Sequence, residues 1–198
     1  MSMREYGPSI GMPRILDLLD KHEIRASFYV PGYIAETHEE LVCDIYNRGH
    51  EIGHHGWTHQ APASLTRDQE QAGLIRCNDA IAALTGHPAR GYRSPSWDLS
   101  PHTVDLLIEQ EFRYDSSMMA HDCSPYYART GDKTPLEEPF VFGETTSLLE
   151  MPISWSLDDH PHFEKWVTPT SSSPGLRNAR GVLENWVDDF IYMRQNVE

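Results

Sequence analysis

Gly49-His50-Glu51-Ile52-Gly53-His54-His55-Gly56-Trp57-Thr58-His59 is the most informative stretch of this sequence. It places two histidines, His55 and His59, four residues apart, with His50 and His54 just upstream. Imidazoles at this spacing can converge on one divalent metal ion, either on a helical turn or in a tight loop. A catalytic metal site usually adds a third protein ligand and an open position for water. The stretch therefore predicts two metal ligands, His55 and His59.

The same stretch also fits a purely structural interpretation. A histidine-rich surface loop, or histidines hydrogen-bonded within the core, would show the same spacing. The run Gly49–Gly53 favours the metal interpretation, because a buried strand would deliver the following loop to one defined place. No glutamate lies between His55 and His59, which argues against a zincin-type protease.

Composition limits the classes of protein that this chain can belong to. A length of 198 residues is enough for one substantial core, and we expect a single domain over residues 1–198. The net charge of −14 argues against nucleic acid and against membrane surfaces as partners. The opening residues 1–6 carry no apolar segment, and the three cysteines are far apart. We therefore expect reduced thiols and a cytoplasmic location.

Helix and strand signals alternate along the chain. The expected helices are 12–21, 35–48, 66–84, 100–110 and 178–194. The expected strands are 25–30, 50–53, 91–93, 112–115 and 148–153. Residues 121–147 are polar and contain Pro, Gly, Asp and Lys, so we expect an irregular surface excursion there.

This alternation predicts an α/β fold with parallel strands and crossover helices. The candidate chemistry recurs just after strands, at His55 and His59, at residues 93–97 and at Asp115. That placement is typical of a (β/α) barrel, whose site is built from the loops at the carboxyl ends of its strands. The chain opens and closes on a helix, and a complete barrel typically needs about 250 residues. We therefore expect an incomplete barrel that lacks its first and last strands.

Three further clusters carry candidate site residues. Arg93-Ser94-Pro95-Ser96-Trp97-Asp98 could hold a carboxylate through the Arg, or it could be an ordinary turn. Asp115 ends a strand and could orient Arg93, or it could simply begin a polar loop. Trp155-Ser156-Leu157-Asp158-Asp159-His160 offers carboxylates and a histidine for acid–base work, and a solvated turn fits it equally well.

The stretch from Gly49 to His59 resembles the histidine motif of the polysaccharide deacetylase (NodB-homology) family. In that family a His, a Ser or Thr, and a second His follow such a strand, which puts the two metal ligands on His55 and His59. Arg93-Ser94-Pro95 resembles the Arg-x-Pro motif, whose Arg steadies the catalytic carboxylate. Asp115 matches the later aspartate motif.

The resemblance extends over nearly the whole chain. Residues 6–14, 112–119 and 155–159 are similar to the intracellular branch, which includes proteins associated with peptidoglycan or cyclic imides and is related to metal-independent allantoinases. The implied fold is a distorted (β/α) barrel of the glycoside hydrolase/deacetylase type. Two family motifs are absent, the early aspartate strand and the late His-Pro strand. The chain therefore resembles a family member truncated at both ends, with the third metal ligand outside it.

The resemblance implies hydrolysis of a non-peptide carbon–nitrogen bond, in an N-acetylated sugar or a cyclic imide. Zinc, or Co or Ni in its place, would be the cofactor, and Arg93 and Asp115 would be the catalytic residues. The substrate pocket would be lined by Trp57, Pro95, Trp97 and Trp155.

Two alternatives stay open beside this one: a metal-independent, allantoinase-like hydrolase, and a non-catalytic ligand-binding pseudoenzyme. Retention of both His55 and His59 weighs against the first. The expected partner is a small-molecule or glycan amide, and symmetric homo-oligomers are common enough to be expected. We expect this chain alone to bind metal weakly and to show little activity.

Overall fold

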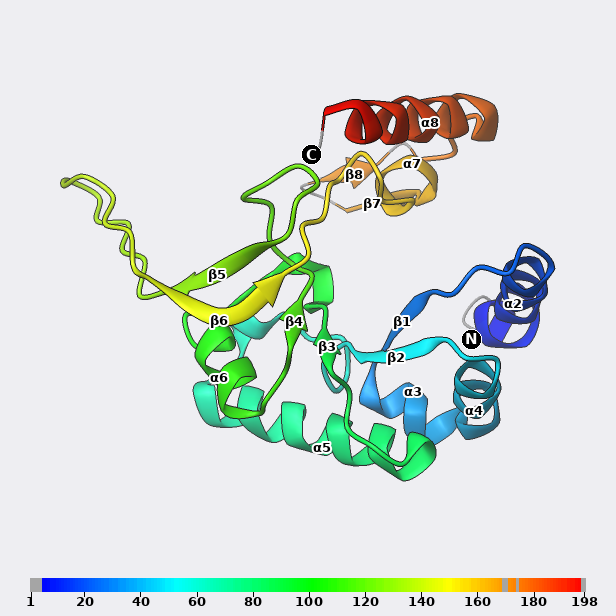
Figure 1. The fold of residues 1–198 in the computed structure, drawn as a ribbon, viewed down its shortest axis with the longest axis horizontal. Helices are drawn as coiled ribbons and strands as arrows, with labels where there is room; N and C mark the ends of the chain where they lie inside the picture. Colours follow the sequence, from blue (N-terminus) through cyan, green and yellow to red (C-terminus); the bar gives the residue numbers. More distant parts are fainter. Residues whose placement is uncertain (1–4, 169–170, 174, 197–198) are drawn as a thin grey trace. The chain divides into compact units, whose positions relative to one another are not determined.

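The computed structural model describes residues 5–168, 171–173 and 175–196 (Figure 1). These residues divide into two compact units. The first unit combines residues 1–117 with 127–150, and the second combines 118–126 with 151–198. Each unit is described by itself, and a single domain over residues 1–198 stays a prediction.

A six-stranded sheet forms the centre of the first unit (Figure 1). Its order is β1 (Ser27–Val30), β2 (Glu51–His54), β3 (Gly91–Tyr92), β4 (Tyr114–Asp115), β6 (Glu144–Glu150) and β5 (Tyr126–Thr130). The strands from β1 to β4 pair in parallel, and β6 pairs in parallel with β4. This confirms the α/β fold with a parallel sheet. Over the described residues the sheet is open, with β1 and β5 at its edges, and does not close into a barrel.

Two helices, η1 (Gly7–Gly11) and α2 (Met12–Lys21), precede β1. The helices that connect the parallel strands β1 to β4 are α3 (Gly32–Thr37), α4 (Glu39–Asn47), η2 (Pro62–Ser64), α5 (Arg67–Thr85), η3 (Pro95–Trp97) and α6 (Thr103–Glu109). The longest, α5, begins at the capping box expected from the sequence, in which Thr66 and Gln69 bond to each other's backbone N–H groups. It ends at Gly86, whose φ of +83° is the left-handed conformation that glycine adopts without strain.

Two expected helices differ from those observed. The helix expected over 35–48 is two helices, because His38 between them has φ −133° and ψ 48°, which are not helical. The helix expected from Ser100 begins at Thr103. Ser100 instead donates its hydroxyl to the buried Glu70 carboxylate at 2.6 Å and accepts the His102 N–H at 2.9 Å, which closes a turn before the helix.

The stretch expected to be irregular over 121–147 is partly regular. It contains all of β5 and the start of β6. An isolated antiparallel bridge between Lys133 and Val141 lies within the same stretch. The expectation failed because the pattern of Pro, Gly and charged residues concealed the short alternating segment Tyr126–Thr130.

One row of side chains runs across the sheet and identifies its helix-covered face. Val30, His54, Tyr92, Asp115 and Glu150 are successive register partners on β1, β2, β3, β4 and β6. All five are at most 6% exposed. His54 reaches the Leu74 carbonyl of α5 at 3.2 Å, so this row faces α5. Successive residues of a strand point to opposite faces, and the residues next along the chain therefore lie on the other face.

The second unit contains α7 (His160–Phe163), the antiparallel pair β7 (Trp166–Val167) and β8 (Ser172–Ser173), and α8 (Ala179–Asn196). Its α8 is attached through Ser156, whose hydroxyl donates to Asp189 at 2.8 Å and whose carbonyl accepts the Trp186 indole N–H at 2.9 Å. Among the described residues, no helix is both long and apolar enough to span a bilayer. Cys43, Cys77 and Cys123 are free in the structure.

Candidate metal and catalytic site

His55 begins the loop after β2, on the face of the sheet opposite to α5. Its backbone N–H bonds to the Val30 carbonyl at 3.2 Å, and its ring Nδ1 lies 2.7 Å from the Arg93 carbonyl oxygen. A carbonyl can only accept, so Nδ1 carries the proton and Nε2 keeps a free lone pair. Burial lowers the pKa of His55 to about 4, so the ring is neutral at pH 7.

His59 lies beside His55. The two ring centroids are 4.9 Å apart. His59 has a φ of +60°, a left-handed conformation that is uncommon for a non-glycine residue, and Gly56 turns the loop before it with a φ of +70°. These two left-handed residues turn the loop so that the His59 side chain lies close to His55. In an extended loop the two side chains would lie farther apart.

The pair fits a divalent metal ion. A neutral imidazole that donates one N–H to a carbonyl and presents its other nitrogen is the usual form of a metal-ligating histidine. His55 has this form, and His59 is close enough to share the ion. In the described part of the chain, no His, Cys, Asp or Glu forms a three-ligand group with these two residues. The structure therefore brings together the two predicted ligands.

His54 and His50, the neighbours of this pair in the sequence, belong to the core. His54 accepts the Gly56 N–H at 3.1 Å and packs at 5.3 Å from the Tyr92 ring. Burial lowers the pKa of His54 to about 3. His50 accepts the Ala26 N–H at 3.3 Å. His54 and His50 thus help to hold β2 in the core, and β2 leads directly into the loop that carries His55 and His59.

Arg93 follows β3 on the same face as His55. Its guanidinium donates to Ser116 twice, from Nε to the carbonyl at 3.0 Å and from Nη2 to the hydroxyl at 2.6 Å. The guanidinium carbon also lies 4.5 Å from the centroid of the Tyr29 ring. The hydrogen bonds described for the Arg93 guanidinium go to Ser116, and orientation of Arg93 by Asp115 stays a prediction.

Asp115 points to the other face of the sheet. Its side chain is fully buried, and Oδ1 accepts the Ser116 N–H at 2.7 Å and the Ser117 hydroxyl at 2.6 Å. Burial raises the pKa of Asp115 to about 6. The structure therefore places Asp115 on the face opposite to His55, and the described hydrogen bonds link it to Arg93 through Ser116.

The expected pocket residues lie in different places. Pro95 is buried against the histidine loop, where a Cβ added at Gly56 would lie 3.0 Å from its Cγ. Trp57 packs under Arg76, with the guanidinium carbon 3.7 Å from a ring centroid, and lines a pocket of about 370 Å³ along α5. Trp97 has a left-handed φ of 54° in η3, and Trp155 belongs to the second unit. A pocket shared by all four stays a prediction.

A separate groove of about 860 Å³ opens beside His59. It is lined by Glu5, Gly7, Pro8, Met12, Tyr33, Ile34, His38, Leu41 and Thr58 together with His59. Sequence reasoning missed Tyr33 and His38 because they lie in and after α3, far along the chain from the histidine loop. It also missed Ser116, which directly follows the predicted Asp115 and whose role depends on the strand order of the folded sheet.

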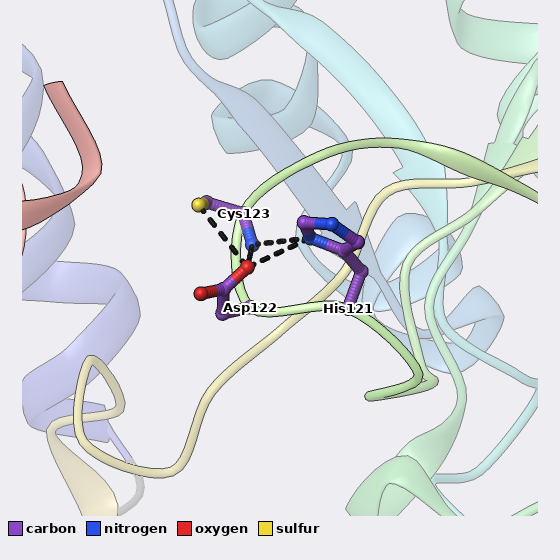
Figure 2. Close-up of side chains that lie close together, drawn as sticks. All are labelled: His121, Asp122 and Cys123. Atoms are coloured by element: carbon purple, nitrogen blue, oxygen red, sulfur yellow. Dashed lines mark hydrogen bonds and ion pairs between the residues drawn. The ribbon is translucent and has the colours of Figure 1, made fainter. Parts of the chain in front are cut away.

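His121, Asp122 and Cys123 form a second cluster of potential ligands, in the second unit (Figure 2). Their ligand atoms lie within 4.8 Å of one another. The His121 Nδ1 atom accepts the N–H groups of Cys123 at 3.3 Å and Ser124 at 3.0 Å, which closes a turn. Desolvation and the hydrogen bond to Asp122 raise the pKa of the Cys123 thiol, which opposes formation of a thiolate ligand. These contacts describe an exposed polar turn.

Comparison with known proteins supplies a family context. The polysaccharide deacetylase family model matches residues 4–114. A peptidoglycan deacetylase from Helicobacter pylori is 33% identical over 203 residues, which cover 98% of this chain and 69% of that protein. A crystal structure from Mycobacterium smegmatis, of a protein described as a candidate polysaccharide deacetylase, is 36% identical with a TM-score of 0.83. The match covers 98% of this chain and 63% of the mycobacterial chain.

The fold is shared more widely. An allantoinase crystal structure matches 97% of this chain and 57% of its own, with a TM-score of 0.76 and 22% identity. At this identity the likeness concerns the fold alone. The chain thus spans roughly three-fifths to two-thirds of the length of these relatives.

Proposed function

This chain belongs to the polysaccharide deacetylase family, and from that membership we propose its function. The chain is proposed to act as a metal-dependent hydrolase that removes the acetyl group from an N-acetylated glycan sugar. The Helicobacter pylori relative is named a peptidoglycan deacetylase, which makes an N-acetylated peptidoglycan sugar the first substrate to test. Hydrolysis of a cyclic imide is the second.

The observation that carries the proposal is the hydrogen bond from His55 Nδ1 to the Arg93 carbonyl, with the His59 ring alongside. This bond fixes the tautomer and the orientation of His55. In the proposed site His55 and His59 hold the ion. The chemistry that a bound divalent ion supplies is polarisation of the amide carbonyl and activation of water.

Arg93 is proposed to act beside the histidine pair. Its guanidinium lies on the same face as His55, held between Ser116 and the Tyr29 ring. A fixed positive charge at this position favours the transition state of amide hydrolysis, in which the acyl oxygen gains negative charge. Asp115 is proposed to support this arrangement from the other face through Ser116, a role that replaces direct pairing with Arg93.

The groove beside His59 is the proposed binding place for the sugar. Tyr33 is 41% exposed there and offers a flat ring against which a pyranose can lie. Glu5 and His38 contribute polar groups to the same groove, and such groups can bond to sugar hydroxyls.

Metal binding and acetate release test the proposal together. The purified protein is stripped with chelator, loaded with Zn²⁺, Co²⁺ or Ni²⁺, and assayed on an N-acetylglucosamine oligomer and on a cyclic imide. His55→Ala and His59→Ala are expected to lower metal affinity at least about tenfold and to abolish acetate release. His22→Ala, which alters an exposed histidine at the end of α2, serves as the matched control.

The outcomes separate the candidate functions. Unchanged metal affinity in His55→Ala would show that the pair does not hold the ion. Full activity in the chelator-stripped protein would instead favour the metal-independent hydrolase. Ligand binding with neither metal binding nor turnover on either substrate would favour the pseudoenzyme.

A further inference from the structure

Glu150 and Asp115 form a buried carboxyl pair behind the candidate site. They are register partners on the adjacent parallel strands β6 and β4, so their side chains project from the same face of the sheet. Both residues are fully buried, and the neighbouring Glu150 side chain acts to lower the pKa of Asp115, as a hydrogen bond between the two would. Ser117 joins them, donating its N–H to Glu150 Oε1 at 2.9 Å and its hydroxyl to Asp115 Oδ1 at 2.6 Å.

Contact between two buried carboxyl groups constrains their proton count. An ionised carboxylate can only accept, so a bond between two carboxyl groups needs one proton on the pair. Two buried carboxylates in contact also repel, which favours the singly protonated state. Below about pH 6, where Asp115 keeps its proton, the pair therefore carries one negative charge.

The surroundings of the pair contain little that would remove this proton. Arg93, which follows β3, attracts the charge of Asp115 but bonds to Ser116 on the opposite face. Tyr92, also on β3, is the buried register neighbour of Asp115. Helix α6 packs against β6 with buried apolar residues, Leu106 and Leu107. Glu70 of α5 is a further buried acid whose oxygens accept the hydroxyls of Ser100 and Thr103.

A short chain of hydrogen bonds links the pair to the site. Ser117 Oγ accepts the Ser94 N–H at 2.8 Å, next to Arg93. The neighbouring Ser116, whose N–H is held by Asp115, fixes the Arg93 guanidinium. The Arg93 carbonyl in turn orients the ring of His55.

We propose that Glu150 is a positioning residue of the site: it shares one proton with Asp115, and the pair clamps Ser116 and Ser117 so that Arg93 and His55 keep their orientation. The inference rests on the proposed function only in taking Arg93 and His55 as site residues. It adds to the site a residue from β6, a strand that carries none of the candidate catalytic groups.

Carbon-detected NMR of the metal-free chain tests the proton count. The carboxyl carbons of Asp115 and Glu150 are followed between pH 4 and pH 9. They are expected to titrate as a coupled pair, with the last proton lost at least about one pH unit above the range of exposed carboxyl groups. Independent titration of both carbons within the ordinary range would overturn the proposal.

The Arg93 Nε–H and Ser117 N–H signals test the positioning role. In the wild type both are expected to shift with the apparent pKa of the pair. Glu150→Gln keeps a donor to Asp115 at every pH, so both signals should become independent of pH over this range while the chain stays folded. Glu144→Gln, an exposed position on the same strand, should leave the wild-type titration unchanged.

Each result decides between the alternatives. If the two signals titrate in Glu150→Gln as they do in the wild type, Glu150 does not position the site. If the variant does not fold, the carbon titration of the wild type alone decides whether the pair shares a proton. Because no metal or substrate is present, failure here leaves the proposed function standing, and failure of the metal assays leaves this inference standing.

Discussion

The His55 Nδ1 atom lies 2.7 Å from the carbonyl oxygen of Arg93, 38 residues further along the chain. Parallel pairing of β2 with β3 creates this contact, because it places the carboxyl ends of both strands at the same edge of the sheet. The histidine motif and the Arg93-Ser94-Pro95 motif are therefore joined by a hydrogen bond to the backbone carbonyl of Arg93. Substitution of the Arg93 side chain leaves this carbonyl in place.

Ser116→Ala tests the other contact of Arg93. The change removes the Ser116 hydroxyl, which accepts a hydrogen bond from Arg93 Nη2 at 2.6 Å. It keeps the Ser116 carbonyl, which accepts a hydrogen bond from Arg93 Nε. Loss of a hydrogen bond to a charged group costs about 1.5–3 kcal/mol, so kcat/KM for acetate release should fall at least about tenfold. Ser96→Ala, at an exposed position of η3, is the control. Equal activity of Ser116→Ala and the control would show that Arg93 is held without this bond.

Asp115→Asn tests the pH dependence of stability. Burial raises the pKa of Asp115 to about 6, from an ordinary value of 3.8, so the folded state binds this proton more tightly than the unfolded state. The resulting stabilisation is full below about pH 4 and is lost as the pH rises through about 6. Since one pKa unit corresponds to about 1.4 kcal/mol, the wild type should lose up to about 3 kcal/mol more than Asp115→Asn between pH 4 and pH 7.

Urea denaturation at a series of pH values provides this measurement. The comparison is between variants, because the buried His54 and His55 contribute with the opposite sign in both proteins. Burial lowers their pKa values, so their contribution to stability is lost as the pH falls. Asp105→Asn, an exposed residue on α6, should follow the wild type. Parallel curves for the wild type and Asp115→Asn would contradict the raised pKa.

The sequence predicted the elements with strong local signals. The helix over 66–84 carries its own capping box and a terminal glycine, and the observed α5 differs from it by one residue at each end. The pairing of His55 with His59 was equally local. The capped helix and the proximity of the two rings were predictable because both partners lie within a few residues of each other, whereas metal binding by the pair stays a prediction.

The surroundings of Asp115 could not be predicted in the same way. A strand of two residues shows no alternation from which to read the direction of its side chains. The neighbour of Asp115, Glu150, lies 35 positions away on β6, which becomes adjacent to β4 only through the strand order of the folded sheet. Its function therefore depends on topology, and no local pattern encodes it.

Glu70→Ala tests the join between α5 and α6. The Glu70 carboxylate is buried and accepts the hydroxyls of Ser100 and Thr103, each at 2.6 Å. Truncation would leave both buried hydroxyls without this acceptor and create a cavity, so the free energy of unfolding should fall by about 3 kcal/mol or more. Glu109→Ala removes an exposed ion pair with Arg67 and should cost less than about 1 kcal/mol. Similar losses in the two variants would contradict a special role for the buried carboxylate.

Gly32→Ala tests how tightly Trp57 is packed. A Cβ at residue 32 would lie 2.3 Å from the Trp57 Cε3 atom and 3.0 Å from the backbone of Cys77. The indole must therefore move away from α3, and such overpacking typically costs about 1–3 kcal/mol. Tryptophan fluorescence should shift with the loss of stability. Gly181→Ala is the matched control, because an added Cβ meets nothing within 4 Å in α8 and should stabilise the helix by up to about 1 kcal/mol. If Gly32→Ala were as stable as Gly181→Ala, the indole of Trp57 would be free to move, and tight packing against α3 would be contradicted.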